Sequence, residues 1–89
     1  MNYRVFWEPH AEGRLVEMLR NSGDAKVLSE AAMRIDSALA VDPIGFGESR
    51  YDTLRIGFVR PLAVQYDVMS DVRTIIVYDV WRIDLGSAH

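Results

Sequence analysis

Cysteine is absent from this chain of 89 residues. Neither disulfides nor a zinc site with cysteine ligands can therefore stabilise it, and a chain this short buries a single modest hydrophobic core. Histidine is scarce, with His10 near the start and His89 at the last position. We expect both imidazoles to be solvated, because two histidines so far apart lack the clustering of a metal site. The sequence thus predicts neither a metal nor a cofactor.

Long apolar runs are missing as well. No stretch approaches the roughly 20 residues of a membrane-spanning helix, and the N-terminus has no signal-peptide pattern. The composition, 49% hydrophobic and 26% charged, is ordinary for a globular protein. Together these observations predict one domain, residues 1–89, that is cytoplasmic and has no membrane partner.

A surplus of basic residues is also lacking. The net charge is -3, from 13 acidic and 10 basic side chains. Nucleic-acid-binding proteins usually carry a positive surplus, because phosphate contacts supply much of their affinity. Yet Lys26 is the one lysine, and every other basic residue is arginine. Arginine suits bidentate contacts and buried ion pairs. Two interpretations of the arginines therefore remain: a local cluster with a function, or ion pairing with carboxylates at a solvated surface.

Apolar spacing predicts two helices. In residues 9–21, apolar side chains recur every three or four positions, and Pro9 suits a first helical turn. Residues 24–41 repeat that spacing, and Pro43 ends the helix because the residue before a proline avoids helical angles. The break between them is so short that we expect an antiparallel helical hairpin.

Alternation of apolar and polar residues predicts four strands. One strand precedes the helices, and three follow a loop at residues 44–49 that contains two glycines. The predicted strands are residues 2–7, 50–58, 62–69 and 73–83. Short links between the last three imply antiparallel pairing. The sequence therefore predicts an α+β domain in the order β-α-α-β-β-β, with the helical hairpin packed on a twisted, mainly antiparallel four-stranded sheet that has one partly open face.

Arginine and aromatic side chains gather on or beside the predicted strands. They are Arg50, Arg55, Arg60, Arg73, Arg82, Tyr66, Tyr78 and Trp81. Arginine can stabilise charge on a cleaved phosphodiester, tyrosine can transfer a proton, and an aromatic ring can stack on a base. In the alternative interpretation the tyrosines belong to the core and the arginines form cross-strand ion pairs, which interleaved aspartates such as Asp67 and Asp79 favour.

Three stretches of the chain resemble one known family. They read YRVFWEPHAEGRL at the start, AAMRIDSALAVDPIGFGESR in the middle and RPLAVQYDVMSDVRTIIVYDVW at the end. Their apolar positions, the helix that ends in DP, the GES-R loop and the paired strands at the finish are similar to the RelE/ParE superfamily of bacterial toxins. These toxins belong to type II toxin–antitoxin systems and include proteins labelled plasmid stabilisation proteins. The resemblance implies a cognate antitoxin protein as the partner.

The same resemblance implies two rival activities. RelE-like members are ribonucleases that cut messenger RNA on the ribosome without a metal, whereas ParE-like members bind DNA gyrase and are not nucleases. For the nuclease alternative, the candidate catalytic residues are Arg60, Arg82, Tyr78 and Tyr66. The candidate substrate-binding residues are Arg55, Arg50, Arg73 and Trp81.

The nuclease pattern is matched only in part. Ala63 stands where RelE-like enzymes have an arginine at the start of the second-to-last strand, and Arg60 lies three residues earlier. The tyrosine expected beyond the last strand is missing, since IDLGSAH follows Arg82. Three alternatives therefore stay open: a metal-independent endoribonuclease, a gyrase-binding toxin, and an inactive member that binds only its partner or forms a homodimer through a strand edge.

Overall fold

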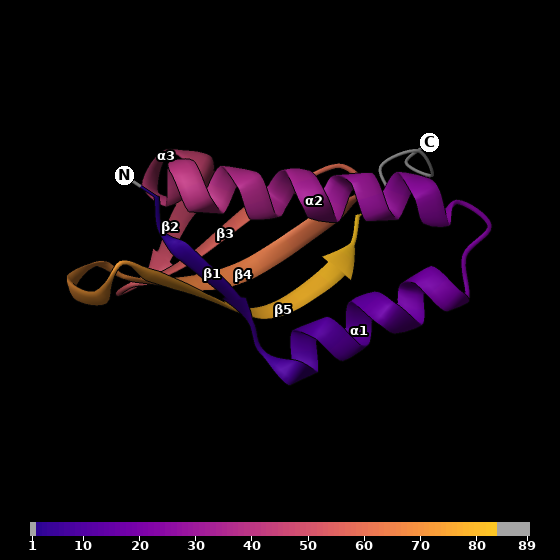
Figure 1. Ribbon diagram of the computed structural model, residues 1–89, viewed down its shortest axis with the longest axis horizontal. Coiled ribbons are helices and arrows are strands. Elements are labelled where there is room, and N and C mark those ends of the chain that lie inside the picture. The colour runs from indigo at the N-terminus through magenta and orange to yellow at the C-terminus, as the bar shows by residue number, and fades with distance from the viewer. Residues whose placement is uncertain (1, 84–89) are drawn as a thin grey trace.

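The computed structural model describes residues 2–83, which form a mixed sheet with helices packed against it (Figure 1). The elements follow in the order β1 (Arg4–Trp7), α1 (Pro9–Arg20), α2 (Ala25–Val41), α3 (Pro43–Phe46), β2 (Glu48–Tyr51), β3 (Leu54–Val59), β4 (Leu62–Met69), the 3-10 turn η1 (Ser70–Val72) and β5 (Thr74–Arg82). The α+β class predicted from the sequence is confirmed. No helix in this part of the chain is long and apolar enough to cross a membrane.

The strands lie in the order β1-β5-β4-β3-β2. The pairs β2–β3, β3–β4 and β4–β5 are antiparallel, as the short links between them predict. β1 is parallel to β5, the last strand in the sequence, so it forms one edge of the sheet while β2 forms the other. Parallel neighbours need a long connection, and the whole chain between β1 and β5 supplies it.

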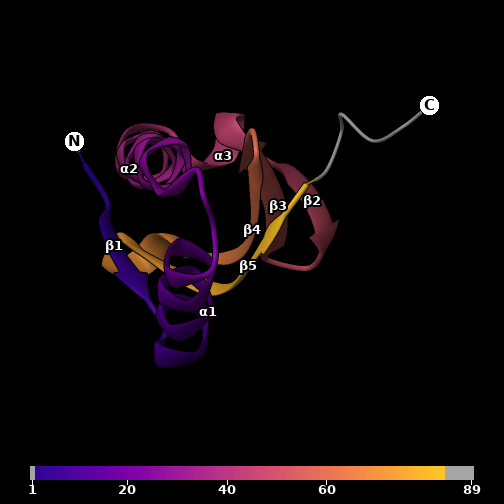
Figure 2. The same cartoon turned by 90° about the vertical axis from the view of Figure 1, so that its right-hand side faces the viewer.

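The two long helices form the antiparallel hairpin that the sequence predicts (Figure 1). α2 buries a stripe at helical spacing, Leu28, Ala31, Ile35 and Leu39, and lies with α3 on one side of the sheet (Figure 2). α1 buries Ala11 and runs along β5 beyond the point where β1 ends. The helices therefore cover one face of the sheet and part of one edge.

The buried face of the sheet comes from alternate positions of its two central strands. They are Leu62, Val64, Tyr66 and Val68 in β4, with Ile75, Val77 and Val80 in β5. The alternation in β5 shifts by one residue, because Tyr66 lies opposite Val77 while Gln65 lies opposite Asp79. Tyr78 is the extra residue of this bulge, which lets β5 keep an apolar face toward the helices along its whole length.

The sheet has five strands rather than the four predicted. The predicted loop at residues 44–49 forms most of α3 and the beginning of β2, and the predicted strand at residues 50–58 is divided between β2 and β3. The division falls at Asp52, whose φ of 55° is left-handed. Aspartate tolerates this conformation in turns, so the chain reverses there and β2 pairs with β3 as a hairpin.

Candidate functional site

The face of the sheet opposite α2 is rich in apolar side chains that do not belong to the core; we call it the open face. Its apolar residues are Phe6, Leu54, Ile56, Phe58, Ala63, Ile76 and Trp81. In residues 2–83, no helix lies over this face (Figure 2). The alternation of Leu54, Ile56 and Phe58 was evident in the sequence, but these three side chains point away from the helices rather than toward them.

Aromatic side chains frame one end of the open face. Phe58 and Trp81 lie directly opposite Ala63 from the strands on either side. Ala63 is only 3% exposed, whereas Phe58 keeps 55% of its surface exposed. The flanking aromatic rings thus shield the alanine from water and leave an apolar surface that a partner can contact.

The opposite face carries two of the candidate residues, Arg55 and Tyr66, which are cross-strand neighbours; Tyr66 is buried and Arg55 is half-buried. The Tyr66 hydroxyl donates a hydrogen bond of 2.6 Å to the carbonyl of Pro43. Arg55 Nη2 donates to the carbonyls of Ile44 at 2.7 Å and Gly47 at 2.8 Å. Both side chains therefore attach the segment from α3 to β2 to the sheet.

Burial determines the protonation of Tyr66. Loss of water raises the pKa of its hydroxyl, and the Arg55 guanidinium opposes this shift only in part. The phenol is therefore neutral at pH 7 and remains a hydrogen-bond donor. A tyrosine that acts as a general base near neutral pH needs a lowered pKa instead.

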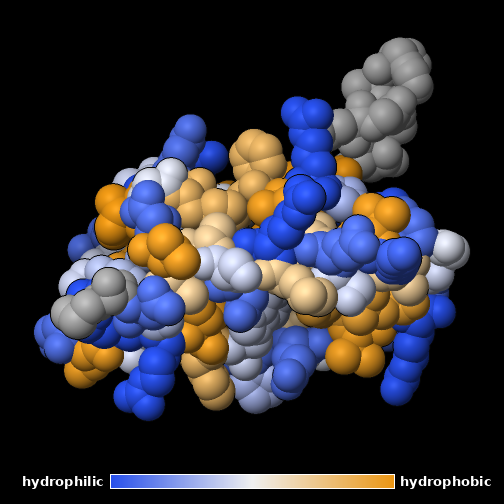
Figure 3. Space-filling view, turned by 45° about the horizontal axis from the view of Figure 1, so that its top comes forward, coloured by the Kyte–Doolittle hydropathy of each residue, from blue (hydrophilic) through white to orange (hydrophobic). Residues whose placement is uncertain are grey.

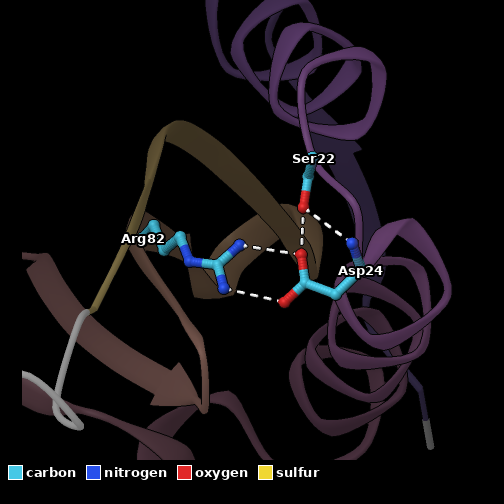
Figure 4. Close-up of polar contacts among 3 residues, drawn as sticks. All are labelled: Ser22, Asp24 and Arg82. Atoms are coloured by element: carbon cyan, nitrogen blue, oxygen red, sulfur yellow. Dashed lines mark hydrogen bonds and ion pairs between the residues drawn. The ribbon is translucent and has the colours of Figure 1, made fainter.

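Arg82 occupies the end of β5 and makes a bidentate ion pair with Asp24 in the link between α1 and α2 (Figure 4). Its Nη1 and Nη2 atoms donate to the two carboxylate oxygens at 3.1 and 2.7 Å. The Ser22 hydroxyl donates to the same carboxylate. Hydrogen bonds from Arg82 and then from Ser22 hold the pKa of Asp24 well below its usual range.

The other candidates on β5 are spread along its length. Arg73 precedes the strand in a left-handed conformation, with its guanidinium 4.3 Å from the centroid of the Tyr3 ring. Tyr78 forms the bulge, and Trp81 is on the open face. Arg73 and Arg82 are thus at opposite ends of β5, each with a partner that fixes it.

Arg50 and Arg60 are exposed candidate arginines, as is Arg82. Arg60 is exposed in the turn between β3 and β4. Arg50 is exposed on the edge strand β2, and its Nη2 is 3.9 Å from a Glu48 carboxylate oxygen. They extend from separate places in the fold, whereas Arg55 and Tyr66 are the pair that the sheet brings together.

Acidic and histidine side chains do not form a metal cluster in the described part of the chain. His10 is exposed, and its Nε2 atom is 3.6 Å from Asp79 Oδ1. The same oxygen forms an ion pair with Arg14 Nε at 3.0 Å. Arg14 Nε also donates to the Val80 carbonyl at the edge of β5 that β1 leaves free. This cluster therefore attaches α1 to β5. His89 lies outside the described residues.

The helix side of the molecule differs in character from the open face. Hydrophobic side chains there are interspersed with charged ones (Figure 3). A hollow of about 450 Å³ lies between α1 and α2, lined by Trp7, Leu15, Leu19 and Met33 among others. Trp7 Nε1 donates to Asp36 at 3.1 Å across it. No local sequence pattern predicts this contact, because the two residues are 29 positions apart.

Comparison of the sequence with family models and with curated proteins found no match. Solved structures do match the fold. The toxin–antitoxin complex RelBE2 from Mycobacterium tuberculosis contains a chain with a TM-score of 0.76 and 14% identity, covering 92% of this chain and 99% of that one. The chromosomal ParDE system of P. aeruginosa gives a TM-score of 0.71 at 15% identity, covering 92% and 97%. The isolated E. coli RelE toxin gives 0.62 at 15% identity, covering 96% and 88%.

Proposed function

We propose, from its RelE/ParE toxin fold, that this protein is the toxin of a bacterial type II toxin–antitoxin pair and arrests growth by binding a protein rather than by cutting RNA. The fold is shared over at least 92% of the chain with toxins of both kinds. Two of the similar structures are named as a toxin–antitoxin complex and a toxin–antitoxin system. A cognate antitoxin is therefore the partner that we propose, in the cytoplasm of a bacterium.

The observation that favours binding over cleavage is the state of four candidate site residues, two of them predicted as catalytic and two as substrate-binding. Arg55, Tyr66 and Arg82 all make hydrogen bonds within the protein, and Arg73 stacks on a tyrosine ring. A catalytic acid, base or phosphate-binding group must be able to reach its substrate. In this arrangement the polar groups of the first three stabilise the fold, while the open face presents apolar side chains.

The net charge of the chain also favours binding over cleavage. The chain carries a net charge of -3, and a surface that binds RNA gains most of its affinity from a positive surplus. An apolar surface with aromatic side chains is typical of the centre of protein–protein interfaces. DNA gyrase is the first target to test, through inhibition of supercoiling by the purified chain.

A metal-independent endoribonuclease is the second candidate. It is favoured by the exposure of Arg50 and Arg60, both of which are accessible to a phosphate. The two candidate functions make opposite predictions for variants of these two arginines. Neither arginine supports the core, so replacing both tests function rather than folding.

Growth after controlled induction of the chain tests the proposal. We expect arrest by the wild-type protein, relief by the co-expressed antitoxin, and undiminished arrest when Arg50 and Arg60 are both replaced by alanine. Loss of arrest in this folded double variant would favour the nuclease. Unchanged growth with soluble wild-type protein would contradict the toxin role itself.

A further inference from the structure

We propose that the open face binds an amphipathic helix of a partner protein. The apolar stripe of this helix contains one arginine, which pairs with Asp67. This inference rests on the proposed function, because the partner is taken to be the protein on which the toxin acts. It names a surface and the chemistry of its occupant, and it can be tested without a toxicity assay.

The apolar part of the open face lacks the cover that sheets usually have. Phe6 and Phe58 are both 55% exposed and lie on strands at opposite sides of the sheet. Between them, Ile76 and Leu54 lie opposite Asp67 on the strands to either side. A sheet buries its apolar face against another layer, most simply a helix, and this face has none among residues 2–83. Exposed apolar surface of this kind marks interaction sites.

Asp67 is a carboxylate with apolar neighbours on both sides in the open face. Its cross-strand neighbours are Leu54 and Ile76, and its Oδ1 atom is buried without a hydrogen-bond donor among the described residues. Such an oxygen reduces stability, since it loses water and gains nothing in return. Asp67 as a residue is only partly buried, so a cation on a docked helix can reach its carboxylate. Apolar surroundings strengthen that attraction.

Of the carboxylates on the open face, Asp67 is the one without an ion pair among residues 2–83. Glu48 lies opposite Ile56, with 81% of its side chain exposed, and adds a second carboxylate on this side. Arg50 Nη2 is 3.9 Å from the Glu48 carboxylate, and Arg4, opposite Thr74, is a basic side chain of this face in the cross-strand row next to that of Asp67. Asp79, opposite Gln65, is already paired with Arg14. The central carboxylate is therefore the one that needs a cation.

The same carboxylate disfavours the other occupants of an apolar face. A second copy of the chain, docked through a two-fold axis, would set the same patch against itself and bring two Asp67 carboxylates together. RNA would bring phosphates toward Asp67 and Glu48. A helix with an arginine among its apolar residues instead pairs the carboxylate while it covers Phe58 and Trp81.

A synthetic peptide is the probe. Its sequence is a short amphipathic helix with leucines along one stripe and one arginine within it, and the control peptide carries citrulline, which is neutral, at the same position. Binding is followed by amide chemical shifts of the labelled protein. We expect shifts confined to β3, β4 and β5, and an affinity about tenfold or more higher for the arginine peptide.

Three variants separate the contributions. Asp67→Asn should remove the preference for arginine over citrulline, Phe58→Ala should weaken both peptides, and Glu30→Gln, on the exposed surface of α2, should change neither. Asp67→Asn should also leave the melting temperature unchanged or higher, because Asp67 has an unsatisfied oxygen in the free protein. A residue retained only for the fold would instead lower it.

Several results would overturn the inference. They are no peptide binding, equal affinity of the wild-type protein for the two peptides, shifts centred on α1 and α2, or a dimer that Phe58→Ala dissolves. Failure of the proposed function is distinct, because it appears as normal growth on induction while the peptide still binds the open face. Arrest that persists in Phe58→Ala, with peptide binding lost, would separate the open face from toxicity.

Discussion

Five arginines of this protein were candidates for one site, and their surroundings give them different roles. Arg55 binds main-chain carbonyls, Arg82 binds a carboxylate, and Arg73 stacks on a ring. Arginine is well suited to all three, because its planar guanidinium has five donors and a polarisable face. Arg50 and Arg60 remain exposed to solvent. At this scale, the partner of each guanidinium distinguishes a structural role from a binding role.

Tyr66→Phe tests the structural role of the buried hydroxyl. The substitution removes the hydrogen bond to the Pro43 carbonyl, and we expect it to cost about 1–2 kcal/mol of unfolding free energy in urea. Tyr78→Phe, at the bulge of β5, is the matched control and should change stability by less than about 0.5 kcal/mol. Equal effects of the two changes would contradict this role for Tyr66.

Asp24→Asn tests the ion pair with Arg82 through pH. The folded protein holds the pKa of Asp24 well below its usual value, so the charged form contributes stability above about pH 4 and loses it as the pH falls further. We therefore expect the wild-type protein to be more stable than the variant at neutral pH, with a difference that shrinks in acid. Urea midpoints at several pH values measure this. A difference that does not vary with pH would contradict the pairing.

At the scale of elements, the segment from α3 to β2 depends on close packing rather than on propensity. Asp42 Oδ1 accepts from the Gly45 amide at the start of α3, and Tyr66 and Arg55 bind three carbonyls of this segment. Gly47 lies so close to the sheet that an added Cβ would be 2.7 Å from the Ile56 carbonyl oxygen and would overlap the Tyr66 hydroxyl. This packing determines where β2 begins.

Gly47→Ala should therefore displace β2 and reduce the unfolding free energy by about 1–3 kcal/mol. Gly13→Ala is the matched control, since it is in α1 with open space around it and alanine favours a helix. It should raise stability by up to about 1 kcal/mol. Urea unfolding measures both, and amide exchange in β2 reports the local effect. A neutral Gly47→Ala would show that the contact is not tight.

At the scale of the whole molecule, local patterns predicted the helical hairpin and the apolar alternation of β4. They missed the reversal at Asp52, because RYDTLRIGF looks like one continuous strand. Alternation also does not tell which side of a strand the helices will cover. The ion pair of Arg82 with a residue 58 positions away was likewise beyond local reasoning, since only the completed fold brings the two together.

The same scale explains why the fold alone does not fix the activity. Chains from the RelBE2 complex, the ParDE system and the isolated RelE toxin share this arrangement of helices and sheet with the chain at 14–15% identity. Activity then depends on the side chains that the shared scaffold exposes. Phe6, Phe58, Arg50 and Arg60 are among the side chains exposed here.

Mapping of messenger RNA 5′ ends in bacteria, shortly after induction of the chain, distinguishes binding from cleavage most directly. We predict that growth stops without new 5′ ends inside coding regions, because the proposed action is contact with another protein. New ends within translated messages that appear before growth slows, and that disappear when Arg50 and Arg60 are replaced by alanine, would contradict this and establish cleavage.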